Sequence, residues 1–222
     1  MSFTLIGLAL VVAFLDWLAV AKKWVTLEYV AKPGVMVVLI AWLISVGGLQ
    51  GYLIPFGLGL VFSLAGDVFL MLPRERFVAG LVSFLLAHIA YIIGFNDTFP
   101  PMNLVTLLVA VLVGLVTLRL YRRISQGLTA SGNEKLKIPV LVYSIVISVM
   151  LLSALLTLVK PEWTALSALL SAFGALLFFI SDSCLAWNKF VQLIPNGRLI
   201  VIITYHVGQI LIITGAALHY LG

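Results

Sequence analysis

The sequence predicts an all-α membrane protein, a polytopic helix bundle that crosses the bilayer about eight times. Of its 222 residues, 63% are hydrophobic and only 9% are charged, whereas a soluble domain carries about 25% charged residues. Lys and Arg also alternate between the connections in the pattern that membrane topology imposes. A chain of this length forms one compact domain, so we expect residues 1–222 to be a single integral membrane domain.

Each predicted helix is an apolar run close to the length of about 20 residues that spans a bilayer. The backbone must satisfy its own hydrogen bonds in hydrocarbon, so these runs form helices. In chain order they cover residues 3–21, 34–50, 52–72, 77–95, 102–120, 138–159, 164–186 and 197–220. The breaks that end the first seven are, in the same order, Lys22-Lys23, the glycine-rich segment 47–51, Pro73-Arg74-Glu75-Arg76, the segment 96–101, the polar stretch 121–137, Lys160-Pro161-Glu162 and the segment 188–197. The second run is short, and the segment 47–51 is the least distinct boundary.

The basic residues predict the orientation of the helices, because Lys and Arg collect in cytoplasmic connections. The first, third, fifth and seventh connections hold all but one of the 13 basic residues. The exception is Lys160, in the sixth connection. We therefore expect these odd-numbered connections in the cytoplasm, both termini outside, and a bacterial-type inner (plasma) membrane. The net charge of +5 is explained by anionic membrane lipid, with no nucleic acid as a partner.

Few residues could hold a metal ion. The only cysteine is Cys184, which excludes a disulfide framework and a cysteine-based zinc site. The three histidines are His88, His206 and His219, and the last lies close to the end of the chain. We expect no metal site and no cofactor.

Three acidic residues lie within predicted helices, where an ionised group costs about 2–3 kcal/mol at the centre of the bilayer. Asp67 and Asp182 each lie about five residues before a cytoplasmic helix end, which is roughly 7 Å inside it. Acids in such positions usually mark functional sites, although each could instead pair with a nearby lysine and lock the bundle. Asp16 stands alone near Lys22 and Lys23, and we interpret it as an interfacial anchor or salt-bridge partner.

Polar side chains on two further helices point to the same region. His88 lies roughly 16 Å inside the helix predicted at 77–95, and Tyr91 shares its face. Tyr205 and Gln209 share a face of the last helix. Each alone would be an ordinary interhelical hydrogen bond of about 0.6 kcal/mol. Together with the two acids they predict a polar pocket that opens toward the cytoplasmic half.

The two halves of the chain show a weak internal similarity. Gly66-Asp67 and Ser181-Asp182 each lie near the end of a helix, a basic connection follows, and the next helix carries His88 or His206. The two acid-bearing helices run in the same direction. A tandem four-helix repeat is therefore a hypothesis that the sequence raises.

Several short motifs resemble the YhhN-type lysoplasmalogenase family of multi-pass membrane hydrolases. They are Lys32-Pro33 opening the second helix, Ser63 to Asp67, Phe77 through His88 to Tyr91, Tyr143, Ser181-Asp182 with Asn188 to Phe190, and Tyr205 with Gln209. The motifs run in order from Lys32 to the end of the chain, and eight helices fit the family. One departure is His206, where the family is expected to carry a second tyrosine.

The resemblance implies hydrolysis of the vinyl ether bond of a lysoplasmalogen, a lysophospholipid, to a fatty aldehyde and a glycerophospho-base. A vinyl ether is protonated at carbon, and water traps the oxocarbenium ion as a hemiacetal. This chemistry needs one protonated acid and one ionised carboxylate, as glycoside hydrolysis does. We expect Asp67 and Asp182 to be that catalytic pair. The expected substrate-binding or supporting residues are Lys32, His88, Tyr91, Tyr143, Lys189, Tyr205 and Gln209, with phosphate at the two lysines.

Two other functions fit part of the pattern. A proton-coupled transporter of lipid or a small solute would also use intramembrane acids and a histidine, and repeats are common in transporters. Transporters often break their helices near mid-span, however, and no predicted helix carries a proline there. A non-catalytic scaffold would leave the acids unexplained. The sequence does not indicate the alkenyl chain length, the head group, which Asp is the acid, or the oligomeric state.

Overall fold

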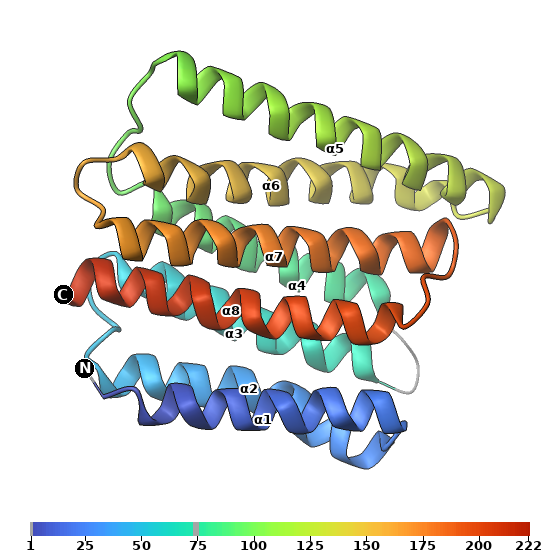
Figure 1. The fold of residues 1–222 in the computed structure, drawn as a ribbon. Helices are drawn as coiled ribbons and strands as arrows, with labels where there is room; N and C mark the ends of the chain where they lie inside the picture. Colours follow the sequence, from blue (N-terminus) through green and yellow to red (C-terminus); the bar gives the residue numbers. More distant parts are fainter. Residues whose placement is uncertain (1, 73–75) are drawn as a thin grey trace.

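The computed structural model describes residues 2–72 and 76–222, and every regular element in these residues is a helix. Eight of the helices are long and apolar enough to cross a membrane, which confirms the predicted number. They are α1 (Thr4–Lys22), α2 (Val25–Ser45), α3 (Leu53–Met71), α4 (Phe77–Phe95), α5 (Leu104–Ala130), α6 (Lys137–Leu156), α7 (Ala165–Phe190) and α8 (Gly197–Leu221), with 3₁₀ turns at Glu134–Leu136 and Thr157–Val159. The protein is an all-α, multi-pass membrane bundle (Figure 1).

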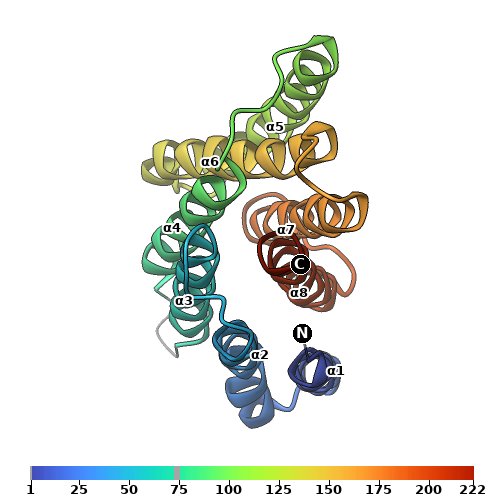
Figure 2. The ribbon, with the colours of Figure 1, turned by 90° about the vertical axis from the view of Figure 1, so that its left-hand side faces the viewer.

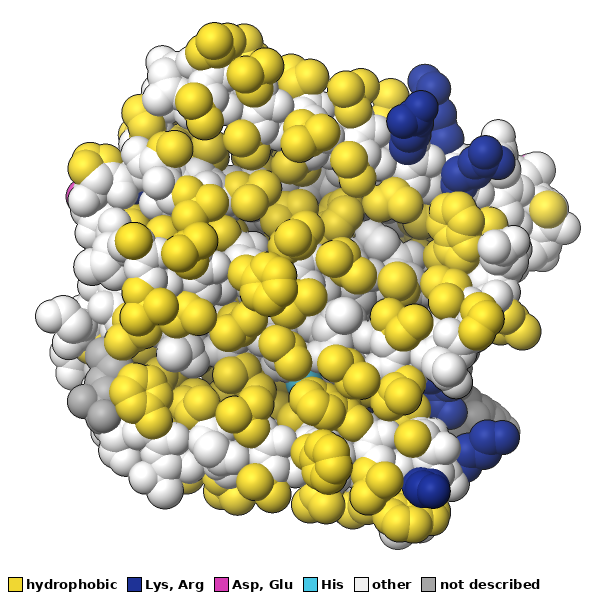
Figure 3. Space-filling model, viewed as in Figure 1, with side chains coloured by type: hydrophobic (Ala, Val, Ile, Leu, Met, Phe, Trp, Pro, Cys, Tyr) yellow, Lys and Arg dark blue, Asp and Glu magenta, His cyan; other side chains and the backbone are white. Residues whose placement is uncertain are grey.

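The outer surface of the bundle is apolar. Hydrophobic side chains cover most of the face in Figure 3, whereas Lys and Arg gather at its right-hand end. That end holds the α1–α2, α5–α6 and α7–α8 connections (Figure 1). The predicted separation of charge between the two ends is therefore present on this face. Arg74, which belongs to the α3–α4 connection, lies outside the described residues.

The helices form a central group of four and two flanking pairs when the bundle is viewed from the end that holds the termini. α3 and α4 face α7 and α8 across the middle, while the pair α1–α2 and the pair α5–α6 flank them on opposite sides (Figure 2). Close packing is most extensive between α7 and α8, between α3 and α4, and between α1 and α2. Gly174 and Gly208 make the α7–α8 contact possible, because a Cβ on Gly174 would lie 2.7 Å from the carbonyl oxygen of Gly208. Small residues at such a crossing let helix backbones approach in a membrane.

The boundaries predicted for α2 are wrong at both ends. The helix begins at Val25 rather than at 34, so Lys32-Pro33 lies within it instead of opening it. A proline inside a membrane helix removes one hydrogen bond, and neighbouring helices can compensate for that loss. The helix ends at Ser45 because Gly47 adopts a φ of +81°, which an α-helix does not allow. The expectation that no helix carries a proline near mid-span is therefore also wrong.

α5 continues through residues 121–130, which were predicted to be part of a long connection. Ile124 and Leu128 on this extension are buried in a small second core with Val140 and Phe190. Gly127 permits this packing, since a Cβ there would collide with the carbonyl oxygen of Phe190. The polar residues of the segment lowered its hydropathy without ending the helix, because only part of the segment has to contact lipid.

Lys160, the one basic residue outside the charge pattern, is neutralised within the protein. Its ammonium donates to the carbonyl oxygens of Phe95 at 2.8 Å and Thr98 at 2.6 Å, and lies 3.5 Å from Oδ1 of Asp97. Burial lowers the pKa of Lys160, and the Asp97 carboxylate acts in the opposite direction. A cation satisfied in this way does not weaken the orientation inferred from the other basic residues.

Both termini lie at the same end of the bundle (Figure 1), as an even number of crossings requires. We expect that end to be outside and Ser131, beyond α5, to be cytoplasmic. In a Cys184→Ser background, cysteine at Gly222 should react with an impermeant maleimide in intact cells, whereas cysteine at Ser131 should react only after permeabilisation. Labelling of both positions from one side would contradict the eight-helix topology.

Candidate active site

Asp182 on α7 lies in a compact cluster with residues from α6 and α4. The hydroxyl of Tyr143 donates to Oδ2 of Asp182, and Nε2 of His88 lies 3.2 Å from the same oxygen. Nε2 of His88 is also 3.0 Å from the Tyr143 hydroxyl. The His88 side chain is fully buried, and that of Asp182 is 12% exposed. Three polar side chains that the sequence placed on separate helices therefore meet at one carboxylate.

Asp67 on α3 forms a second cluster. Nζ of Lys32, from α2, lies 3.4 Å from its Oδ1, and the hydroxyl of Tyr205, from α8, donates to its Oδ2 at 2.8 Å. The Asp67 side chain is only 1% exposed. The carboxylate is thus contacted by one ammonium and one hydroxyl donor. Lys32 was expected at a phosphate site, and it also forms an ion pair with one of the two predicted catalytic acids.

Gln209 and Tyr91 extend the Asp67 cluster deeper into the bundle. Tyr91 on α4 donates to Oε1 of Gln209 at 2.6 Å, and Nε2 of Gln209 donates to Oγ of Ser63 at 2.7 Å. All three side chains are fully buried. Interhelical hydrogen bonds of this kind contribute about 0.6 kcal/mol each. The two predicted supporting residues therefore connect α8 to α3 and α4.

Aromatic rings separate the two clusters. The ring of Phe178 lies 4.6 Å from that of His88 and 5.3 Å from that of Tyr205. Phe84 packs edge-on against both Phe178 and Tyr205. The two carboxylates thus lie in adjacent sites, and the ring of Phe178 contacts both clusters.

The two clusters are built on the same plan. Asp67, on the third helix, is contacted from α2 in its own half and from α8 in the other half. Asp182, on the seventh helix, is contacted from α6 in its own half and from α4 in the other half. This exchange is what a tandem four-helix repeat would produce. The first helix of each half packs on the second helix of its own half, but α1 also packs on α8 in the other half, whereas α5 also packs on α7 in its own half.

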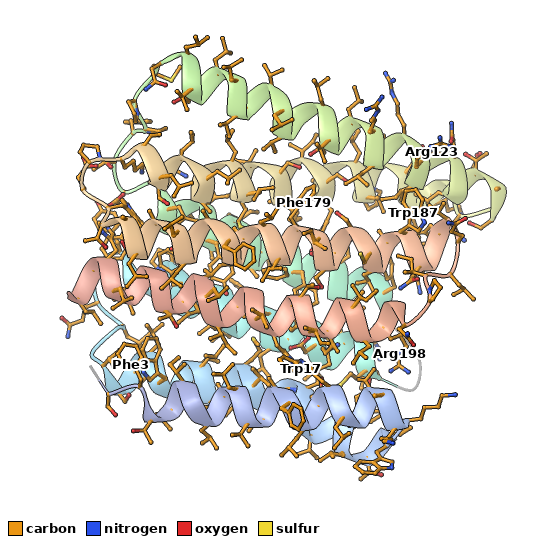
Figure 4. The ribbon with its side chains drawn as sticks, in the orientation of Figure 1. Phe3, Trp17, Arg123, Phe179, Trp187 and Arg198 are labelled. Carbon is orange, nitrogen blue, oxygen red and sulfur yellow. The ribbon has the colours of Figure 1, made fainter. Side chains whose placement is uncertain are left out.

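Asp16 is buried inside the bundle, so the interpretation as an interfacial anchor is wrong, while the alternative of a salt-bridge partner meets His206 rather than a lysine. Its side chain is fully buried, and its Oδ2 lies 4.0 Å from Nδ1 of His206. Trp17 donates to the same nitrogen at 3.3 Å and lies between α1 and α8 in Figure 4. Neither carboxylate oxygen of Asp16 has a hydrogen-bond partner among the described residues. The packing of α1 on α8 turns Asp16 inward, and the sequence of α1 alone does not reveal that rotation.

Two pockets adjoin these clusters. The first, which we call the apolar pocket, lies between α4, α5, α6 and α7 and has Asp182 and Tyr143 in its otherwise largely apolar wall. The second, which we call the polar pocket, opens at the charge-rich end. Its charged and amide lining residues are Lys23, Glu28, Lys32, Asn188, Lys189 and Arg198. Leu70, Phe77 and Leu185 line both pockets, so the pockets meet there.

The remaining predicted site residue and the acids relate to these pockets in different ways. Lys189 lines the polar pocket and its ammonium lies 4.9 Å from the centre of the Phe77 ring. Asp67 is absent from the described lining of both pockets and reaches the polar pocket through Lys32. In the part of the chain that the structure describes, no group of three His, Cys, Asp or Glu side chains could hold a metal ion.

Comparison with known proteins identifies the family. Residues 27–216 match the YhhN family. The chain belongs to the YhhN family. This YhhN protein is 31% identical over 205 residues to lysoplasmalogenase TMEM86B of Mus musculus, a match that covers 91% of the chain and 80% of the relative. It is 32% identical over 218 residues to lysoplasmalogenase TMEM86A of Homo sapiens, covering 92% and 84%.

A bacterial relative extends the similarity. The YhhN protein is 32% identical over 183 residues to a lysoplasmalogenase of Mycobacterium bovis, covering 77% of the chain and 62% of the relative. No solved structure matches the chain. The resemblance seen in the short sequence motifs is therefore confirmed at the level of the family.

Three residues of the site had not been identified from the sequence. Phe84 and Phe178 separate the two acid clusters, but a phenylalanine in a membrane helix has the same sequence signal whether it contacts lipid or lines a site. Glu28 lines the polar pocket, and it was overlooked because the second helix was predicted to begin after it. A helical extension through residues 25–33 would have placed Glu28 and Lys32 on one face.

Proposed function

We propose that this YhhN protein is a lysoplasmalogenase, a membrane hydrolase that cleaves the vinyl ether bond of a lysoplasmalogen. The observation that carries the proposal is an apolar pocket with Asp182 in its wall that meets a cation-lined pocket at Leu70, Phe77 and Leu185. A lysoplasmalogen has an apolar alkenyl chain at one end, a phosphate head group at the other, and the vinyl ether between them. The relatives named lysoplasmalogenase support the same function.

The substrate fits the two pockets in one direction. The alkenyl chain lies in the apolar pocket, and the phosphate lies in the polar pocket near Lys32 and Lys189. The vinyl ether then lies beside Asp182. Ammonium groups bind phosphate as point charges, and burial of the chain contributes about 0.8 kcal/mol per CH₂ group.

Asp182 is the general acid in this proposal. His88 and Tyr143 both contact Oδ2 of Asp182. No described residue hydrogen-bonds to Oδ1, which is therefore available to carry the proton. Its side chain lies in the wall of the apolar pocket. Asp182 is thus the acid that can touch the substrate.

Asp67 is the ionised partner. The Lys32 ammonium and the Tyr205 hydroxyl both contact its carboxylate, and the ring of Phe178 contacts both this cluster and that of Asp182. A fixed negative charge near the reacting carbon stabilises the positive charge that develops in the transition state. Asp67 therefore acts through the electric field of its carboxylate, without contact with the substrate.

The reaction proceeds in three proton-balanced steps. Asp182 donates its proton to the vinyl carbon remote from the oxygen, which forms a C–H bond and an oxocarbenium ion. Water adds to the cation and gives a proton back to the Asp182 carboxylate, which leaves a hemiacetal. Asp182 then protonates the glycerol oxygen as its C–O bond breaks and takes the hemiacetal hydroxyl proton. The products are the fatty aldehyde and the glycerophospho-base, and Asp182 ends in its starting form.

Purified protein in detergent should release fatty aldehyde from a lysoplasmalogen, and a saturated alkyl-ether analogue should be inert. The alternative function, a proton-coupled transporter of lipid or a small solute, is favoured by Pro33 inside α2. A transporter needs a sealed membrane, whereas a hydrolase works in detergent. Failure to release aldehyde from any member of a lysoplasmalogen panel, by a folded protein, would contradict the proposal.

A further inference from the structure

The apolar pocket is shallow beyond Asp182. Toward the middle of the membrane, its described lining extends from Asp182 to Phe179 on α7 and from Tyr143 to Ile147 on α6. Three or four residues of helix correspond to about 4.5–6 Å. A lipid chain spans one leaflet, which is about half of the roughly 30 Å hydrocarbon core. An alkenyl chain whose vinyl ether lies beside Asp182 is therefore longer than the pocket that receives it.

Two of the helices that line this pocket, α5 and α7, meet at the charge-rich end. A Cβ on Gly127 of α5 would collide with the carbonyl oxygen of Phe190 on α7. Ile124 and Phe190 also belong to the same small core. From this contact the two helices diverge toward the other end of the bundle (Figure 1).

The side of α5 that touches α7 at Gly127 changes its surroundings along the helix. Leu120 and Val116 precede Gly127 by seven and eleven residues, close to two and three full turns, so they lie on the same side. Leu120 is partly buried and lines the apolar pocket, whereas Val116 is 42% exposed. A neighbouring α7 at the level of Val116 would cover that side chain.

α7 shows the same sequence of surroundings. Ser183 and Leu176 precede Phe190 by seven and fourteen residues, close to two and four turns. Ser183 is partly exposed and lines the apolar pocket, and Leu176 is 37% exposed. Ser183 directly follows Asp182, so the pocket opens sideways toward lipid at the depth of the proposed acid.

We propose that the substrate chain leaves the apolar pocket through this lateral opening, whose rim is formed by Val116, Leu120, Leu176 and Ser183. The protein encloses the vinyl ether and the first few carbons, while the rest of the alkenyl chain stays in the leaflet at the charge-rich end. The substrate is therefore taken directly from the bilayer, and the fatty aldehyde returns to it. This inference rests on the proposed function and adds the form in which the substrate is recognised.

The lateral opening has a consequence for specificity. Carbons that remain in the bilayer exchange one apolar environment for another, so they contribute little free energy of binding. A closed pocket would instead reject a chain longer than itself, because overpacking costs about 1–3 kcal/mol. In lipid nanodiscs, the wild type should therefore cleave a lysoplasmalogen whose chain spans a leaflet as readily as one whose chain ends inside the pocket.

A photolabel locates the end of the chain without depending on turnover. The probe is the saturated alkyl-ether analogue with a diazirine on its last carbon, bound in nanodiscs and displaced by unlabelled lysoplasmalogen as a control for specificity. The label should reach Val116, Leu176 or bilayer lipid. The same analogue with the diazirine beside the ether should label Phe179 or Ile147 in the pocket wall.

A pair of matched variants on α5 tests the opening itself. Val116→Trp adds bulk at the rim and should lower the ratio of kcat/KM for the long chain to that for the short chain about tenfold, which corresponds to about 1.4 kcal/mol. Leu118→Trp adds the same kind of bulk at a residue that is 44% exposed. Leu118 precedes Gly127 by nine residues, two and a half turns, so it lies on the opposite side of α5, and the ratio should remain native. Turnover of the short chain shows that each variant is folded.

Three results would overturn the inference. They are a wild type that cleaves the short chain but not the long one, a chain-end label confined to Phe179 or Ile147, and an equal ratio in Val116→Trp and Leu118→Trp. The proposed function stands in all three. A folded wild-type protein that cleaves neither chain length would instead refute the proposed function, and the inference with it.

Discussion

Asp182→Asn should lower the rate of aldehyde release by about 10² to 10⁴-fold, which is the contribution of a positioned proton donor. Asn has nearly the volume of Asp, and its oxygen can still accept from Tyr143 or His88, so we expect the bundle to fold. Because Asn cannot donate a carboxylic proton, the loss should appear in kcat, while KM changes little. Single-turnover measurements with saturating lysoplasmalogen would give this rate directly.

Asp67→Asn should cause a loss of similar size for a different reason. It removes the negative charge that stabilises the oxocarbenium ion. It also leaves the Lys32 ammonium without its carboxylate partner, which lies 3.4 Å away in the native protein. Replacing Lys32 with Met in the same chain removes that unpaired cation. The double variant should therefore unfold at a higher temperature than Asp67→Asn, without recovery of kcat.

A partly buried acid outside the site is the matched control for both changes. Asp97 is 11% exposed and lies near Lys160 and His219 at the opposite end of the bundle, where neither pocket has a lining residue. Asp97→Asn should lower the melting temperature and leave the kcat of the folded protein near the native value. Native turnover in a folded Asp67→Asn or Asp182→Asn variant would remove that residue from the mechanism. Loss of folding in both would favour the interpretation that the acids lock the bundle.

Gly174→Val should be among the most destabilising single substitutions in the helices. A Cβ at this position would lie 2.7 Å from the carbonyl oxygen of Gly208 and 2.7 Å from the amide nitrogen of Ile212. Backbone atoms of α8 cannot rotate away as a side chain can, so the two helices must separate. Overpacking of this kind costs about 1–3 kcal/mol or more. Separation would also move Tyr205 away from Asp67, so activity should fall with stability.

Gly114→Val is the control for that substitution. Gly114 lies on α5, also within a membrane-spanning helix, but a Cβ there meets no atom within 4 Å. The melting temperature in detergent, followed by tryptophan fluorescence or by retention on size exclusion, should fall for Gly174→Val and remain near the native value for Gly114→Val. Equal melting temperatures for the two variants would contradict the role assigned to the α7–α8 contact.

The number of helices and their kind were predictable because they depend on composition along the chain. The boundaries of α2 and α5 were not, since both helices continue into polar residues that face a pocket or an aqueous surface. Glu28 and Lys32 look like a connection when hydropathy alone is considered. Polar residues end an apolar run, but they do not end a helix.

The residues of the site were predictable one at a time, whereas their partners were not. A buried carboxylate in a membrane helix has a clear sequence signal, so Asp67 and Asp182 were identified without the fold. Whether His88 meets Asp67 or Asp182 depends on which helices are neighbours and on how each is rotated. Asp16 shows the same limit, because its burial follows from the contact of α1 with α8, which no local pattern encodes.

The exchange of contacts between the two halves has a consequence for how the protein is made. Tyr205 follows Asp67 by 138 residues, so during synthesis Asp67 enters the membrane with only Lys32 as a partner. Asp182 emerges after His88 and Tyr143, which precede it by 94 and 39 residues. The cluster in the second half can therefore assemble as soon as α7 is inserted, while the cluster in the first half stays incomplete until the ribosome delivers α8. A chain that stalls before its last helix would leave the Asp67 carboxylate inside the bilayer with only one of its two partners. The missing Tyr205 contact would distinguish that chain from the finished protein.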